Sequence, residues 1–226
     1  MLKLNQKFIV SSGTLHKISF GPFKTIDINK GKQHLVGRQE EVYLDVKGKN
    51  TGIKKGVNKI KSQPFSLVII QDEKDTIISN MDVISMREKR ALVEIRSGKA
   101  QDDESTVSYF EDISIQTRSD SLNWQMTQDN DQEDDDLEFP LSFKGILTNG
   151  ADKILAEGAD GFPVKRKTFA NSTKGIVFLY KKKQVAALET YPETSIWFSN
   201  DINKNHKQVI AAAIISILSL LKYVMK

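Results

Sequence analysis

The chain has 226 residues with a formal net charge of +4, and it contains no cysteine. Disulfides, thiolate metal sites and cysteine nucleophiles are therefore excluded, and this composition fits a reducing compartment such as the cytoplasm. The three histidines, His16, His34 and His206, lie far apart in the sequence and do not have the spacing of a metal site.

Short strand-like segments follow one another from the amino terminus. Residues 1–11 alternate in hydrophobicity and lack the continuous apolar stretch of a secretory signal. The later segments are rich in β-branched or aromatic residues or alternate with period two. Because no amphipathic helix separates them, we expect antiparallel strands in a barrel or sandwich. The predicted strands are residues 7–10, 15–20, 25–28, 41–46, 65–70, 76–78, 91–96, 105–110, 112–117, 121–126, 139–147, 153–157, 164–169, 175–180, 184–189 and 194–198.

Two segments contain little that favours a strand. Residues 47–61 are rich in glycine and lysine, and residues 129–138 form an acidic run whose like charges repel one another. The strand pattern is similar on both sides of the acidic run, so a domain boundary there is the less favoured alternative. We predict two exposed loops, near 47–61 and 129–138, within a single domain that spans residues 1–226.

Basic residues gather in the first of these segments and again near residue 166. Such clusters can bind the phosphates of anionic lipid, where each lysine near a charged bilayer contributes about 1 kcal/mol. Exposed lysines also serve solubility and prevent sheet edges from pairing, which is the simpler interpretation. The candidate anion-binding residues are Lys47, Lys49, Lys54, Lys55, Lys59, Lys61, Lys165, Arg166 and Lys167.

Asn149 and Gly150 form the strongest turn signal in the chain. Both residues tolerate the positive φ that the two central positions of a type I′ turn require. The sequence therefore predicts a hairpin between residues 143–148 and 153–157.

The carboxyl-terminal segment has a different pattern, typical of a helix. Asn200, Asp201 and Asn203 can each cap its start, and residues 209–221 are apolar on every face. These 13 residues span about 20 Å as a helix, whereas the hydrocarbon layer of a bilayer is roughly 30 Å thick. We therefore expect the helix to be buried inside a β-barrel, and a tail anchor in a membrane is the alternative.

The closing part of the chain resembles the tubby-like superfamily, which includes tubby carboxyl-terminal domains, phospholipid scramblases and LURP-one-related proteins. The resemblance covers residues 139–226. It rests on a strand beginning Gly175-Ile-Val-Phe-Leu-Tyr, a strand containing Ser195-Ile-Trp-Phe-Ser, and the apolar helix that begins at Val209. It implies a mostly β fold, a closed antiparallel barrel of about twelve strands around a central hydrophobic carboxyl-terminal α-helix.

No phosphate-binding glycine loop, serine nucleophile motif or metal-ligand set occurs in the sequence. We therefore expect no catalytic residue, cofactor or metal, and a non-enzymatic binding module. The resemblance implies anionic phospholipid surfaces of the phosphoinositide type as the ligand, and a protein partner is the alternative. We do not expect nucleic acid as a ligand, and we expect a cytoplasmic monomer that associates with membranes peripherally.

Overall fold

The computed structural model describes residues 4–12, 17–47, 50–94, 100–118, 123–128, 143–160, 174–190 and 193–224. The chain forms two compact units where the sequence predicted one domain. The first, here called the barrel unit, comprises Met1–Asn29, Ser66–Met81 and Glu111–Lys226. The second, here called the ribbon unit, comprises Lys30–Phe65 and Asp82–Phe110.

The barrel unit is a nearly closed antiparallel barrel of twelve strands. The neighbouring strands follow the order β1-β14-β13-β12-β11-β10-β9-β8-β7-β6-β4-β3-β2. β1 and β2 are separated only by Val10, so this one stretch of chain pairs with β14 on one side and with β3 on the other. The elements are β1 (Leu4–Ile9), β2 (Ser11–Ser12), β3 (Ile18–Phe20), β4 (Phe23–Lys30), β5 (His34–Lys47), β6 (Asn50–Gln71), β7 (Asp75–Glu94), β8 (Ala100–Thr117), β9 (Trp124–Gln128), β10 (Lys144–Thr148), β11 (Lys153–Asp160), β12 (Lys174–Tyr180), β13 (Lys183–Glu189), β14 (Ser195–Ser199) and α1 (Lys204–Val224).

Strands β8 and β9 of the barrel bury every second side chain, as period-two alternation requires. In β8, Ile113 and Ile115 are fully buried, whereas Asp112 and Gln116 are exposed. Trp124 and Met126 of β9 repeat the pattern on the neighbouring strand. Alternate residues of successive strands therefore line one common interior.

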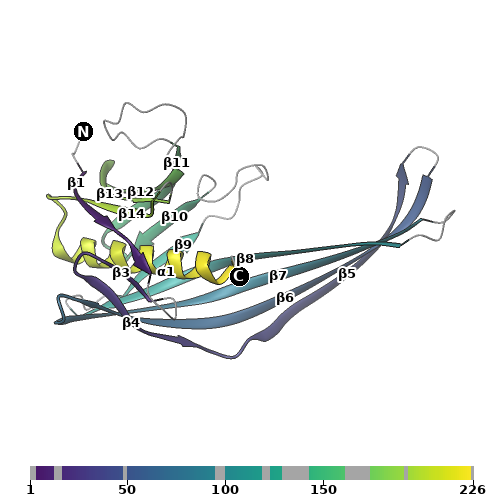
Figure 1. Cartoon of the computed structure of the whole chain (residues 1–226), viewed down its shortest axis with the longest axis horizontal. Helices are drawn as coiled ribbons and strands as arrows, with labels where there is room; N and C mark the ends of the chain where they lie inside the picture. Colours follow the sequence, from purple (N-terminus) through teal and green to yellow (C-terminus); the bar gives the residue numbers. More distant parts are fainter. Residues whose placement is uncertain are drawn as a thin grey trace. The chain divides into compact units, whose positions relative to one another are not determined.

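Helix α1 occupies that interior, and in Figure 1 it lies among the strands of the barrel unit. All residues from Val209 to Leu220 are buried, on every side of the helix. A helix that is apolar all round needs such an enclosure, which the inward faces of the strands provide. Within the described part of the chain, α1 falls short of the length and apolarity that a bilayer crossing requires. The predicted barrel around a central carboxyl-terminal helix is confirmed.

The start of the helix agrees with one of the three predicted caps. The side-chain Oδ1 of Asn203 accepts a hydrogen bond from the backbone N–H of His206 at 2.7 Å. This is the bond that a capping asparagine makes to the third residue of a helix. In the middle of the helix, the Oγ atoms of Ser216 and Ser79 lie 2.8 Å apart, so one buried polar contact fixes α1 against β7.

The predicted hairpin between β10 and β11 is present, with Lys144 opposite Glu157 and Thr148 opposite Lys153. Its turn differs from the prediction. Gly150 has a φ of 88°, but Asn149 does not have a positive φ, so the central pair is Gly150–Ala151 rather than Asn149–Gly150. Asn149 instead accepts backbone hydrogen bonds from Ala151 and Asp152 through its side chain. The prediction of a type I′ turn was therefore wrong, because Asn149 occupies the first position of the turn and accepts backbone hydrogen bonds there.

The predicted loop at residues 47–61 was also wrong. Lys47 ends β5, and residues 50–61 belong to β6, which pairs with β5 along thirteen residue pairs. The apolar residues Ile53, Val57 and Ile60 interrupt the lysines, and an adjacent strand supplies the backbone partners that a loop lacks. The second predicted loop, at residues 129–138, lies outside the described residues.

Candidate functional site

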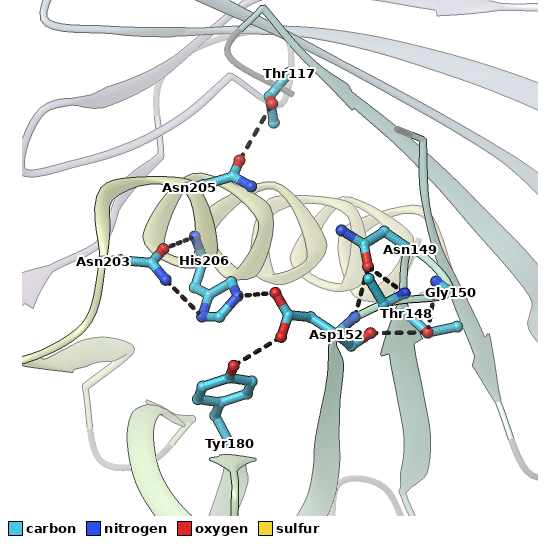
Figure 2. Close-up of polar contacts among 10 residues, drawn as sticks. Thr117, Thr148, Asn149, Gly150, Asp152, Tyr180, Asn203, Asn205 and His206 are labelled. Atoms are coloured by element: carbon cyan, nitrogen blue, oxygen red, sulfur yellow. Dashed lines mark hydrogen bonds and ion pairs between the residues drawn. The ribbon is translucent and has the colours of Figure 1, made fainter. Parts of the chain in front are cut away.

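A polar cluster lies where helix α1 begins, and Figure 2 shows its members turned toward one another. We call it the helix latch, and it consists of Asp152, Tyr180, Asn203 and His206. His206 Nε2 lies 3.2 Å from Asp152 Oδ2, and the hydroxyl of Tyr180 donates to Asp152 Oδ1 at 2.7 Å. The imidazole is almost completely buried and packs edge-on against the rings of Tyr180 and Trp124. The latch therefore joins the helix start to the turn between β10 and β11 and to the end of β12.

The hydrogen bonds of Asn203 determine the tautomer of His206. Oδ1 of Asn203 accepts from the backbone N–H of His206, so its amide nitrogen is the atom that faces the ring, 3.1 Å from Nδ1. An amide nitrogen only donates, and Nδ1 must therefore accept and carry no proton. The ring proton is on Nε2, which donates to Asp152. His206 is consequently the neutral partner of an ionised carboxylate in this arrangement.

Asp152 is held in its charged form. The hydrogen bond from the Tyr180 hydroxyl is the largest cause that lowers the pKa of Asp152, and His206 contributes in the same direction. Both ring nitrogens of His206 are bonded within the latch, so the imidazole has no nitrogen available to take a proton from a substrate. The hydrogen bonds of the latch therefore hold the start of α1 against the barrel.

A second polar group completes the same end of the helix. The first turn of α1 contains no acidic residue, and Lys204 in that turn binds Asp75 of β7 at 2.6 Å. The hydrogen bond from Lys204 lowers the pKa of Asp75. Gln208 donates to Gln71 and to Asp75. Asp75 thus supplies the negative charge that stabilises the amino terminus of a helix, from a neighbouring strand.

The structure distributes the predicted basic residues unevenly. Lys47 ends β5, and Lys54, Lys55, Lys59 and Lys61 all lie on β6 in the ribbon unit. Lys59 is exposed and Lys61 half-buried, with its ammonium 3.4 Å from the side-chain oxygen of Gln33. The remaining candidates lie outside the described residues; they are Lys49, Lys165, Arg166 and Lys167.

Register brings three cations onto one face of the β5–β6 hairpin. Arg38 lies directly opposite Lys59, and residues opposite one another in an antiparallel pair share a face. Lys61 shares it as well, because it follows Lys59 by two residues along β6. We call Arg38, Lys59 and Lys61 the cationic face. Arg38 could not be recognised from the sequence, because it lies 21 residues from Lys59 and only the strand pairing brings the two together.

The hairpin as a whole carries an excess of basic residues. Residues 30–65 contain nine basic and three acidic residues. The other segment of the ribbon unit, residues 82–110, contains five basic and six acidic residues, so it does not share the excess. Like charges directly across a strand pair are destabilising, and together they give this face a positive potential.

Comparison with known proteins does not supply a family. No family model, no curated protein and no solved structure matches this chain. The resemblance to the tubby-like superfamily therefore stays a prediction, and the function has to be argued from the described residues themselves.

Proposed function

We propose that this protein is a non-enzymatic binding module that recognises anionic phospholipid surfaces through the cationic face of its β5–β6 hairpin. The observation that carries the proposal is the pairing of Arg38 with Lys59, with Lys61 beside them. Lys59 is exposed, so phosphate groups of a membrane can approach its side chain, and Arg38 lies exposed opposite it.

The expected strength follows from the number of charges. A cation close to an anionic leaflet contributes about 1 kcal/mol, so the three residues of the cationic face provide roughly 3 kcal/mol before the other lysines of the hairpin are added. Interactions of this kind weaken over a screening length of about 10 Å at 0.1 M salt. Binding should therefore be modest in strength and strongly dependent on salt.

The helix latch supports the non-enzymatic part of the proposal. The hydrogen bonds that His206 makes with Asn203 and Asp152 occupy both of its ring nitrogens. A general base needs a free nitrogen or oxygen within reach of the substrate proton. We therefore assign the latch to stability and place recognition on the hairpin.

Two alternatives remain from the sequence. An acidic protein surface offers the same charge as a membrane and is the competing partner. A tail-anchored protein would require α1 to leave the barrel, and the side chains of Val209–Leu220, buried within the chain, would then lose their enclosure. The resemblance to the tubby-like superfamily favours the lipid, because it implies a phosphoinositide-like headgroup as ligand.

Sedimentation of the full chain with vesicles tests the proposal. One set of vesicles contains only zwitterionic lipid, and the other contains about one third anionic lipid, at salt concentrations from about 0.05 to 0.5 M. We expect binding to the anionic set alone, falling steeply as salt rises. Absence of binding to anionic vesicles at the lowest salt would overturn the lipid ligand.

A matched pair of variants locates the binding surface. Lys59→Glu with Lys61→Glu reverses two charges of the cationic face, whereas Lys24→Glu with Lys144→Glu makes the same charge change at exposed positions of the barrel unit. We expect the first pair to lose roughly tenfold or more in affinity for anionic vesicles and the second pair to lose clearly less. Equal losses in both pairs would show that only net charge matters, which contradicts a site on the hairpin.

A further inference from the structure

A β-bulge interrupts the β5–β6 hairpin beside the cationic face. Leu35 is paired with Lys61 and Gly37 with Ile60, so Val36 is an extra residue on β5 with no residue opposite it. Leu35 and Arg38 are three residues apart and would face opposite sides of a regular strand. The extra residue reverses the alternation, and Leu35 consequently shares the face of Lys61, Lys59 and Arg38.

The bulge also exposes two large apolar side chains in succession. Leu35 is 58% exposed and Val36 is 59% exposed. The other exposed large apolar residues among the described ones, Ile9, Ile26 and Ile78, are not adjacent to one another in the sequence. An apolar pair bordered by cations is the composition of surfaces that enter the interface of an anionic bilayer.

We propose that Leu35 and Val36 form a wedge that inserts into the headgroup region of an anionic membrane while the cationic face binds the lipid phosphates. This inference rests on the proposed function and specifies how the hairpin engages the lipid. Leu35 and Val36 leave water for the acyl boundary, and Arg38, Lys59 and Lys61 stay at the level of the phosphates, since long basic side chains keep their charge in the polar layer.

The apolar pair favours a bilayer over the other anionic partners. The phosphates of a nucleic acid or the carboxylates of an acidic protein segment would satisfy the cations but would leave two aliphatic side chains beside charged groups. A bulge alone is explained by protection of a sheet edge, because it disrupts the pairing of a further strand. Protection of an edge does not require leucine and valine, because charged residues usually serve that role.

The decisive experiment compares two double variants of the full chain in the vesicle assay. Leu35→Ser with Val36→Ser removes the wedge and keeps every charge, whereas Ile9→Ser with Ile26→Ser removes two exposed apolar side chains from the barrel unit. We expect the wedge variant to partition onto anionic vesicles roughly tenfold to hundredfold less than the wild type, with the salt dependence retained. The control pair should stay within about twofold of the wild type, because its side chains have no role in insertion.

The outcomes separate the wedge from the proposed function. If the wild type binds anionic vesicles in a salt-dependent manner and the wedge variant binds equally well, the wedge is overturned and the cationic face stands. If the wild type itself does not bind anionic vesicles, the wedge and the proposed function are both overturned. Circular dichroism of each variant shows that a loss of binding is not a loss of folding.

A fluorescent probe reports insertion directly. The chain has no native cysteine, so Val36→Cys can be labelled at one site with a fluorophore sensitive to polarity. Anionic vesicles should shift its emission to shorter wavelength, and the same label on Ile9→Cys should not respond. An unchanged emission at position 36 under conditions where the protein binds would contradict insertion.

Discussion

The barrel unit and the ribbon unit use similar strands for different purposes. In the barrel unit, alternate residues are buried around α1, and basic and acidic residues nearly balance, at 19 and 20. The ribbon unit has 14 basic and nine acidic residues and displays two adjacent apolar side chains at a bulge. The apolar side chains of α1 are thus enclosed by the barrel, whereas Leu35 and Val36 at the bulge of the ribbon unit are exposed. An aliphatic side chain such as Ile214 therefore contributes to the stability of the barrel, whereas Val36 at the bulge remains exposed to solvent.

The largest expected effect comes from placing a charge in the centre of the barrel. Ile214→Asp puts a carboxylate at a fully buried position of α1. We expect a loss of roughly 4–5 kcal/mol or more, enough to prevent folding of a domain of ordinary stability. Val36→Asp is the matched change in the ribbon and should alter the free energy of unfolding by no more than about 0.5 kcal/mol. Urea unfolding followed by circular dichroism measures both, and similar losses in the two variants would contradict the difference in burial between α1 and the bulge.

The next effect concerns the helix latch. His206→Leu keeps an apolar body but removes the hydrogen bonds to Asp152 Oδ2 and to the side-chain amide of Asn203. We expect a decrease of roughly 2 kcal/mol in the free energy of unfolding, since the buried imidazole loses two hydrogen bonds, one of them to an ionised carboxylate. His34→Leu, at an exposed position of the ribbon unit, is the control and should be nearly neutral. A loss below about 1 kcal/mol for His206→Leu would mean that packing alone holds the helix start.

A stabilising change can be made in a barrel turn. Lys181 and Lys182 connect β12 to β13 with φ values of 50° and 62°, a left-handed conformation that costs lysine energy. Lys181→Asn with Lys182→Gly fits the preferred residues of such a turn and should raise stability by roughly 1–2 kcal/mol. Thermal unfolding measures the gain. The same variant should bind anionic vesicles as the wild type does, and a loss as large as that of Lys59→Glu with Lys61→Glu would place recognition on the barrel instead.

The smallest effect depends on pH. The hydroxyl of Tyr180 lowers the pKa of Asp152 in the folded state, so the stability from this contact is complete above the unfolded-state pKa of about 3.9 and is lost as pH falls through the folded-state value. Tyr180→Phe should therefore destabilise the protein by about 1 kcal/mol at neutral pH. The difference from the wild type should shrink below about pH 4. A difference that stays constant through acidic pH would show that the hydroxyl acts by another route.

The barrel could be predicted because its signals are local. An apolar run too short for a bilayer and capped by Asn203 predicts a buried helix, and alternating segments predict the strands around it. The segments at 105–110 and 112–117 were predicted as two strands, and they form the single strand β8, because Glu111 interrupts the alternation without breaking the backbone. The barrel is thus evident in the sequence even where its boundaries are not.

The candidate sites could be predicted only in part, because they depend on pairing. Asp152 lies 54 residues from His206, and no local spacing connects them. The lysines of β6 were recognised as a cluster but assigned to a loop, and Arg38 and the apolar pair of the bulge were missed. Leu35, Arg38, Lys59 and Lys61 share a face only because the pairing of β5 with β6 contains one extra residue. The composition of neither strand indicates where that residue lies.

Cysteine accessibility compares the two regions most directly. Because the native chain is free of cysteine, Ala213→Cys on the fully buried helix and Val36→Cys at the exposed bulge each introduce one thiol. We predict that a thiol reagent labels position 36 rapidly in native buffer and labels position 213 only after denaturant has been added. Labelling of position 213 in the folded protein at the rate of position 36 would contradict the enclosure of α1 by the barrel.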